Sequence, residues 1–172
     1  MNKQAVAVFL AVASVFVLVG AVAWHHANHV SRAQTIAITL EPVAALLNEN
    51  QEIIKELQTE PFTENGAGIL ESYLAKVRRD GVAMHADMKQ RLDQLAENNT
   101  AIVALIKAYA PRAKTRAFTA DADKFRNYAS AWRDRWNSVM ELFMAGGNYP
   151  VSGVPFPNGF PEAVQAEISA QK

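Results

Sequence analysis

An uncharged apolar run near the N-terminus limits what this chain can form more than any other feature. It reads AVAVFLAVASVFVLVGAVAW over residues 5–24, and its only small polar or flexible breaks are Ser14 and Gly20. As a helix with about 1.5 Å rise per residue, the run would be roughly 30 Å long, the thickness of a bilayer's hydrocarbon core. The run therefore predicts one transmembrane helix. We assign it to residues 5–26, after a short cytoplasmic N-terminus at residues 1–4.

A cleaved secretory signal is the alternative interpretation of the same run. Lys3 supplies a positive N-terminal region, and Ala21-Val22-Ala23 has the small-x-small form of a cleavage site. We favour a retained anchor because the apolar run exceeds the roughly 7–15 residues usual in such signals. Lys3 lies on one side, and only Arg32 lies within about 20 residues on the other. This bias predicts a single-pass protein of a bacterial inner membrane, with its soluble part in the periplasm.

Three histidines follow the run in the stretch Trp24-His25-His26-Ala27-Asn28-His29. We favour an interfacial role, in which Trp24 belongs to an aromatic belt and the imidazole rings lie among lipid headgroups. If the helix continues, however, His25 and His29 lie one turn apart on one face, a spacing that suits two ligands of a metal ion. A single axial histidine for a haem or chlorophyll-type pigment is a further alternative.

Composition indicates one globular domain besides the apolar segment. The chain has 172 residues, 50% of them apolar and 20% charged, and it has no cysteine, which excludes disulfides, thiolate metal sites and cysteine nucleophiles. The net charge is zero, but most of the charged residues in 41–64 are acidic and most of those in 107–135 are basic. Two helices of opposite charge could lie side by side, or the basic stretch could face phospholipid. We expect no nucleic-acid partner, since no known nucleic-acid module is present.

The sequence pattern of the soluble part predicts an all-α fold. We expect an antiparallel bundle of three or four helices over residues 27–147. Residues 40–57 begin with Glu41-Pro42, typical of a first helical turn, and carry a broad apolar stripe. A second helical segment has an apolar seam of about 40 residues, from Leu70 to Tyr109. Gly81 and Asn99 interrupt this seam. Gly81 could allow a bend, Asn99 could fix the register, or either could mark a break between two helices.

The last long helix of the bundle is predicted after Pro111. Thr119 and Asp121 are suited to cap its start, and Gly146-Gly147 to end it. One side of this helix is rich in aromatic residues, which is typical of a core-facing surface. We expect His85, beside the seam of the preceding segment, to be a hydrogen-bonded histidine at the edge of the core.

The C-terminal region, residues 148–172, is predicted to be an extended docking tail that ends in a short helix over residues 161–170. Its first part, NYPVSGVPFPNGFP, has no charge and combines prolines with aromatic residues. Exposure of this much aromatic surface to solvent is unfavourable, so we expect the segment to dock on the bundle, a partner or the membrane surface. The candidate partner-binding residues are Trp24, Tyr149, Val154, Phe156 and Phe160.

The stretch MHADMKQRLDQLAENNTAIVALIKAYA, residues 84–110, resembles the central helical region of the LemA family. The matching positions are Ala86, Asp87, Leu92, Val103, Lys107, Tyr109 and Ala110. Residues 126–137 and the tail ending in GFPEA are also similar to the family's closing segment. The resemblance implies one N-terminal membrane helix and an antiparallel helical bundle. It implies no catalytic residues.

No sequence pattern typical of an active site is present. The chain lacks a glycine-rich phosphate loop and any supported Ser-His-Asp arrangement. We therefore expect no enzyme, no catalytic residue and no cofactor. The preferred function is a non-catalytic accessory or scaffold subunit that binds and stabilises a larger integral membrane protein complex. The alternatives are a periplasmic ligand-binding or sensory bundle, and a metal or pigment carrier that uses His25 and His29.

Overall fold

A computed structural model of the chain describes residues 32–59, 62, 67–146 and 154–171. The predicted anchor, Trp24, His25, His29 and Tyr149 lie outside these residues. Within them the chain is all-α, with five α-helices and no strand, which confirms the all-α helical bundle. Among the described helices, none is both long enough and apolar enough to cross a bilayer.

Short turns join α3 to α4 and α4 to α5, whereas residues 58–68 separate α2 from α3 and residues 146–159 separate α5 from α6. A π-helix, η1, precedes α2 without a break, and 3-10 turns η2 and η3 lie at either end of α4. The elements are η1 (Ile36–Leu40), α2 (Glu41–Leu57), α3 (Ile69–Asp80), η2 (Val82–His85), α4 (Ala86–Tyr109), η3 (Ala110–Arg112), α5 (Arg116–Ala145) and α6 (Phe160–Gln171).

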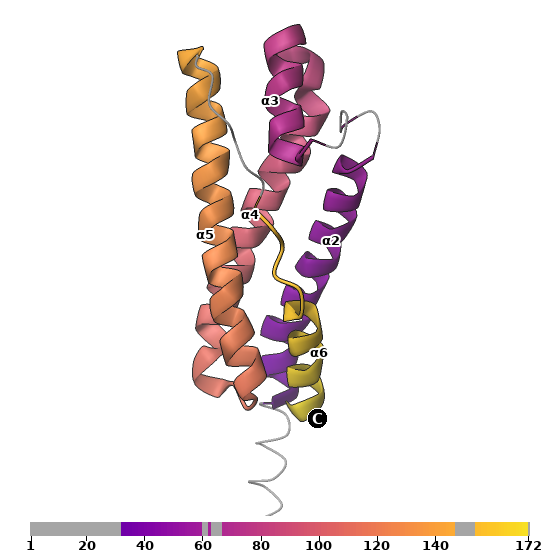
Figure 1. Cartoon of the computed structure of the whole chain (residues 1–172). Coiled ribbons are helices and arrows are strands. Elements are labelled where there is room, and N and C mark those ends of the chain that lie inside the picture. The colour runs from indigo at the N-terminus through magenta and orange to yellow at the C-terminus, as the bar shows by residue number, and fades with distance from the viewer. Residues whose placement is uncertain (1–31, 60–61, 63–66, 147–153, 172) are drawn as a thin grey trace, which may run out of the picture.

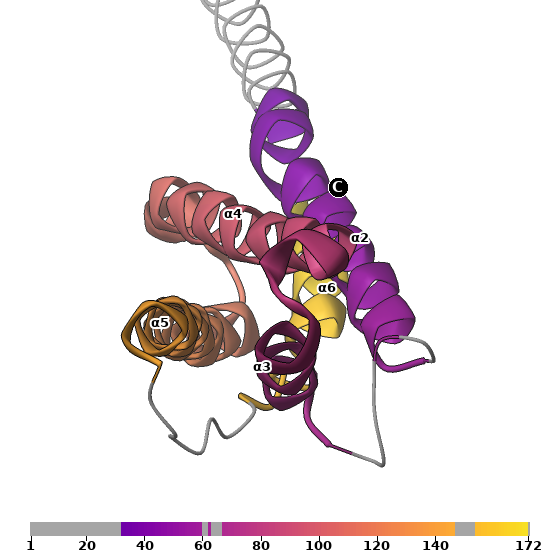
Figure 2. The same cartoon turned by 90° about the horizontal axis from the view of Figure 1, so that it is seen from above.

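Four positions make up the bundle, and two helices share one of them. As drawn in Figure 1, α2 and α3 run upward, α4 runs down, α5 runs up and α6 runs down again. Viewed along the bundle, α6 lies next to α3, on the side of α3 that faces α2, whereas α2, α4 and α5 each occupy their own corner (Figure 2). The fourth corner is therefore filled by α3 in the upper half and by α6 in the lower half.

Two hydrophobic cores correspond to these halves. The lower core joins η1, the first half of α2, the end of α4, the start of α5, and α6. The upper core joins the end of α2, α3, the start of α4 and the end of α5. Its fully buried or nearly buried residues are Leu57, Leu70, Tyr73, Leu74, Val77, Met88, Leu92, Leu95, Trp132, Trp136 and Val139.

Gly81 divides the predicted 40-residue seam into two helices. Its backbone has φ 88° and ψ 158°, a conformation that essentially only glycine adopts, and the chain reverses there between α3 and α4. Asn99, the other seam interruption, lies inside α4. Of the two alternatives left open by the sequence, the break therefore applies to Gly81 and not to Asn99.

The start of α5 differs from the prediction, and its end agrees. The cap is Thr115, whose hydroxyl accepts a hydrogen bond from the Phe118 amide, so the assignment of the cap to Thr119 and Asp121 was wrong. Both residues lie inside the first turns of the helix, because Thr115 is already extended and its side chain is available to the free amides. Gly146 ends α5 with φ 64°, which confirms the predicted left-handed cap.

The described part of the C-terminal tail lies along the bundle. Residues 154–157 have no regular structure, and α6 follows from Phe160, one residue before its predicted start. Val154 packs against both cores, and Phe156 packs against the lower one. These residues thus lie on the chain's own bundle, which is the first of the three alternatives.

The acidic and basic helices are not close neighbours. The main contacts of α2 are with α4, α6 and η1, whereas α5 packs mainly on α4, α6 and α3. In Figure 2, α4 lies between α2 and α5. The basic charges of α5 are therefore not neutralised by pairing with the acidic face of α2.

Candidate functional site

The described tail residues that were predicted to bind a partner take part in packing within the bundle. Phe160 has none of its surface exposed; its ring stacks on Phe125 at 4.8 Å and lies 6.2 Å from Phe118. Phe156 is half-buried and makes edge contacts with Phe125 and Tyr128. A buried ring offers no surface to another protein, so Phe160 is unavailable to a partner while the bundle is folded in this way.

Val154 borders a shallow apolar groove. The groove has a volume of about 330 Å³ and lies where the end of α2, the start of α3 and the tail approach Trp132 of α5. Its lining residues are Gln58, Gly68, Ile69, Leu70, Trp132, Val154 and Pro155. Of the described tail residues, Val154 and Pro155 are thus placed where a partner's apolar side chain could contact them.

An asparagine layer separates the two cores. Gln94 donates to the Asn98 carbonyl oxygen at 2.9 Å, Asn98 donates to that of Asn50 at 3.0 Å, and Asn50 donates to that of Asn99 at 3.0 Å. The three asparagines are buried. The sequence singled out Asn99 but missed Asn50 and Asn98. Asn50 continues the three- and four-residue spacing of the apolar stripe on α2, and this spacing was the signal that could have identified it.

Two buried donors beside the asparagine layer have no hydrogen-bond partner among the described residues. They are the Asn99 amide nitrogen and the Trp132 indole nitrogen. Tyr128 on α5 adjoins this layer: burial raises its pKa to about 12, and the Asn99 side chain, which faces the Tyr128 hydroxyl without reaching hydrogen-bond geometry, opposes the shift. Its ring centroid is 6.5 Å from that of Trp132. Unpaired buried donors are uncommon in folded proteins, which makes this layer a candidate for binding a polar ligand atom.

A second buried polar cluster joins α6 to the turn before α5. Glu167 accepts hydrogen bonds from the Tyr109 hydroxyl at 2.5 Å, the Lys114 amide at 2.7 Å, the Thr115 amide at 2.9 Å and the Thr115 hydroxyl at 2.7 Å. Gln171 donates to the same carboxylate at 3.2 Å. The Glu167 carboxylate of α6 thus accepts hydrogen bonds from the free backbone amides of Lys114 and Thr115, just before α5. The sequence analysis missed this cluster, although Phe160, Val164, Glu167 and Gln171 share a helical face.

The hydrogen bonds of this cluster control its ionisation. Burial raises the pKa of Glu167, but the hydrogen bonds from Tyr109, Lys114 and Thr115 outweigh burial and hold the pKa below its ordinary value. Burial, and then the hydrogen bond to Glu167, raise the pKa of Tyr109 well above its ordinary value. Glu167 is therefore an anion and Tyr109 a neutral donor at neutral pH, an arrangement suited to holding helices together.

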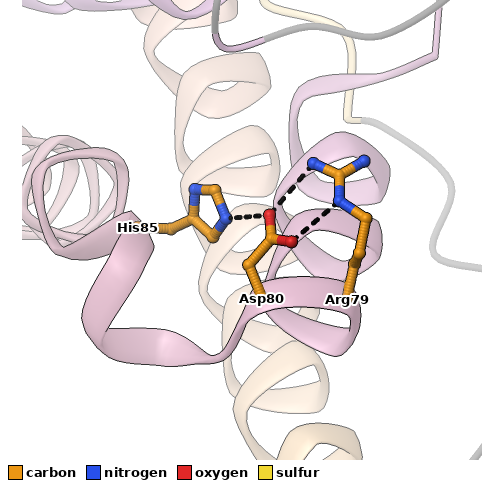
Figure 3. Close-up of polar contacts among 3 residues, drawn as sticks. All are labelled: Arg79, Asp80 and His85. Atoms are coloured by element: carbon orange, nitrogen blue, oxygen red, sulfur yellow. Dashed lines mark hydrogen bonds and ion pairs between the residues drawn. The ribbon is translucent and has the colours of Figure 1, made fainter.

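The turn between α3 and α4 carries the third polar cluster, shown in Figure 3. The Arg79 guanidinium makes two hydrogen bonds to the Asp80 carboxylate, at 2.9 and 3.0 Å, and His85 Nε2 lies 2.9 Å from Asp80 Oδ2. The hydrogen bonds from Arg79 and then from His85 lower the pKa of Asp80 to about 2. His85 is partly buried and hydrogen-bonded, as predicted.

Metal binding finds little support in these clusters. Asp80 and His85 supply one carboxylate and one imidazole, and no group of three possible metal-ligating side chains occurs within the described ranges. The predicted pair His25 and His29 lies outside those ranges.

Two large apolar side chains are exposed at the end of the bundle remote from residue 32. Met84 in η2 is 75% exposed, and Met144 in the last turn of α5 is 83% exposed. η2 and the end of α5 both lie at the top of Figure 1, whereas the described chain begins at the bottom. Methionine is flexible and polarisable, so such side chains adapt readily to a partner surface.

Comparisons with known proteins add no relative. No family model matches the chain, and neither the curated proteins nor the solved structures contain a match. The resemblance to the LemA family stays a prediction. The candidate sites are therefore defined by the chain's own sequence and geometry.

Proposed function

We propose that this chain is a non-catalytic, single-pass accessory or scaffold subunit that binds and stabilises a larger membrane protein complex of a bacterial inner membrane. The observation that carries the proposal is the polarity of the bundle along its length. Residue 32, which follows the apolar run in the sequence, lies at one end, and the exposed side chains of Met84 and Met144 belong to elements at the other. The bundle would thus stand on the anchor and present its far end to a partner.

The reach of the bundle supports this arrangement. α5 has 30 residues, so it is about 45 Å long at 1.5 Å per residue. The anchor at residues 5–26 would therefore hold the methionines tens of ångströms from the bilayer, where they could contact the extramembrane part of a neighbouring protein. The groove beside Val154 and Pro155 would be a second contact, halfway along the bundle.

The use of the buried polar groups also agrees with a scaffold. Glu167 and the linked pairs of the asparagine layer connect helices that are far apart in sequence. Such buried networks favour one arrangement of the helices over others, which is what a subunit that only positions its neighbours requires.

Co-purification after mild detergent extraction tests the proposal. The full chain is expected to bring down at least one integral membrane protein, and the double substitution Met84→Glu and Met144→Glu is expected to lower its recovery by about tenfold or more, as for loss of interface hot spots. The control is Thr100→Glu with Ala104→Glu, which changes two exposed residues on the side of α4. A chain that is recovered only as a monomer would contradict the proposal.

The periplasmic location is part of the proposal and has its own test. Alkaline phosphatase fused after Lys172 is expected to be active, because it folds only after export to an oxidising compartment. A cytoplasmic fluorescent reporter fused at the same position is expected to stay dark if it requires the cytoplasm to fold. The opposite pair of results would place the bundle on the cytoplasmic side.

A ligand-binding or sensory bundle is the second candidate, and the unpaired donors of Asn99 and Trp132 favour it. A ligand that supplies an acceptor there would satisfy both groups, and binding next to Trp132 would change the indole fluorescence. A screen of small carboxylates and amides by tryptophan fluorescence tests this candidate. Asn99→Leu, which removes the amide donor and keeps Trp132 as the reporter, is expected to abolish the response.

The metal or pigment carrier remains the third alternative from the sequence. Metal analysis and an absorption spectrum of the purified full chain test it. Stoichiometric metal or pigment that is lost in the His25→Ala, His29→Ala variant would establish it.

A further inference from the structure

Four exposed cations gather at the end of the bundle where the described chain begins. Residues 98–120 contain no aspartate or glutamate, and their charged residues are Lys107, Arg112, Lys114 and Arg116. All four are exposed, and they occupy the last turn of α4, η3 and the start of α5. This turn lies at the bottom of Figure 1, together with the first described residues and the end of α6. We call these four residues the basic end.

The four cations of the basic end form no ion pair with a described carboxylate, so their positive charges are largely uncompensated. Further along α5, three of the four cations are paired within the helix: Lys124 with Asp121, Arg126 with Asp123, and Arg133 with Asp134. By contrast, Lys107, Arg112 and Arg116 form no ion pair among the described residues, and the Lys114 ammonium reaches only the Ala170 carbonyl oxygen at 3.4 Å. Glu41, at the start of α2, is exposed and also forms no ion pair with them.

Glu167 is the carboxylate that packs against this turn, and it cannot neutralise the basic end. It is fully buried, and its oxygens accept hydrogen bonds from Tyr109, Gln171 and the backbone before α5. Arg116 also lies in the first turn of α5, where the helix dipole disfavours a positive charge. Cations held without partners in such a position are suited to bind an external anion.

We propose that the basic end rests on anionic phospholipid headgroups next to the membrane anchor. This inference rests on the proposed function, because it requires that the run at residues 5–24 be inserted. Arg32 follows Trp24 by eight residues, a distance of at most about 28 Å for an extended chain. The tether therefore keeps this end of the bundle, and not the far end, close to the lipid surface.

A lipid surface agrees with the other exposed groups near this end. Arg32 is exposed and adds a fifth cation, and Ile38 in η1 is 66% exposed. A bulky apolar side chain among cations is typical of surfaces that lie in the interfacial layer of a bilayer. No recognised nucleic-acid module accompanies the cations, so lipid is the better-supported anion.

The expected effect is large enough to measure. Each lysine or arginine close to an anionic bilayer favours the docked state by about fivefold at low salt. The attraction falls off over a Debye length of about 8 Å at physiological ionic strength, so added salt is expected to weaken docking. Three removed charges should thus lower the ratio of docked to undocked bundle by about a hundredfold.

Energy transfer to labelled lipid tests the proposal in the full chain. Since the chain has no cysteine, Ala108→Cys at the basic end and Ala83→Cys at the far end can each carry a single donor dye. The protein is inserted in vesicles of phosphatidylcholine alone, or of three parts phosphatidylcholine to one part phosphatidylglycerol, with an acceptor dye on the headgroups. Transfer from position 108 is expected to rise with phosphatidylglycerol and to fall with salt, whereas position 83 should not respond.

Matched variants separate the basic end from overall charge. Lys107→Gln, Arg112→Gln and Arg116→Gln together are expected to abolish the rise, and Lys124→Gln, Arg133→Gln and Arg135→Gln, with the same loss of charge, are expected to retain it. Equal transfer in the two kinds of vesicle would overturn the proposal, as would a response of position 108 to added RNA but not to phosphatidylglycerol.

Flotation of the same samples distinguishes failure of this inference from failure of the proposed function. A chain that does not float with the vesicles has no inserted anchor, and both proposals then fall. A chain that floats but shows no dependence on phosphatidylglycerol overturns only the contact of the basic end with lipid.

Discussion

Glu167 shows how a single side chain connects distant parts of this chain. Its carboxylate fixes the two backbone amides before α5, and at the same time it anchors α6 to the end of α4 through Tyr109. A buried carboxylate is costly unless it is well hydrogen-bonded, and this one has five donors. Its contribution therefore depends on keeping its charge.

Glu167→Gln is expected to destabilise the bundle by about 2–3 kcal/mol, because the amide group turns two donor hydrogens toward existing donors. The loss can be measured by thermal unfolding of the full chain in mild detergent, followed by circular dichroism. Glu162→Gln, which changes an exposed carboxylate on the same helix, serves as the control.

The wild-type bundle is also expected to lose stability at acid pH. The folded-state pKa of Glu167 lies below its ordinary value of 4.5, so its stabilisation is complete above pH 4.5 and is lost as the pH falls through the lower pKa.

The asparagine layer leads to a second prediction at the residue scale. Asn50→Leu would leave the Asn98 amide and the Asn99 carbonyl oxygen without the partners they have now. Because each orphaned buried group costs about 1–3 kcal/mol, we expect a loss of about 3 kcal/mol in the free energy of unfolding. Asn48→Leu, at an exposed position two residues away, is expected to change it little. Equal effects of the two substitutions would show that the layer does not contribute to stability.

At the scale of elements, Gly81 determines where the long apolar seam reverses. Its positive φ lets α3 end and η2 begin within one residue, and the Arg79-Asp80-His85 cluster then bridges the turn. Gly81→Ala is expected to cost about 1–3 kcal/mol through backbone strain alone, since no atom lies within 4 Å of the added methyl group. Gly68→Ala, at a glycine with φ −65°, is the control and is expected to change thermal stability only slightly.

Local patterns predicted the helices better than their connections. The apolar spacing identified the segments that became α2, α4 and α5, and Gly146 correctly marked the end of α5. The cap at Thr115 could not be told from that at Thr119, because both threonines precede apolar residues at helical spacing. The Glu167 cluster joins residues more than 50 positions apart, and no local pattern indicates which carboxylate will meet a given turn.

At the scale of the whole molecule, the two cores give the bundle halves with different partners. The lower core needs α6, whereas the upper core needs α3, and the asparagine layer lies between them. The halves are therefore expected to respond separately to damage, even though α2, α4 and α5 run through both. The sequence predicted a bundle but not this division, because it gave no indication that α3 and α6 share a corner.

Phe160→Ala tests the division. The loss of a fully buried ring is expected to cost about 3–5 kcal/mol and to raise amide hydrogen exchange mainly in η1, the first half of α2 and the end of α4. Phe143→Ala, at a half-buried ring of the upper core, is the matched variant and should raise exchange mainly in α3 and the start of α4. Uniform exchange changes in both variants would indicate one cooperative core.

The shared corner also affects the order in which the protein can be assembled. α6 is synthesised after α2, α3, α4 and α5, and until it is made Phe160 does not pack on the aromatic rings of Phe118 and Phe125. A chain that lacks α6 would therefore expose aromatic surface, which favours aggregation and recognition by chaperones. Packing of α6 over these rings would then complete the lower core.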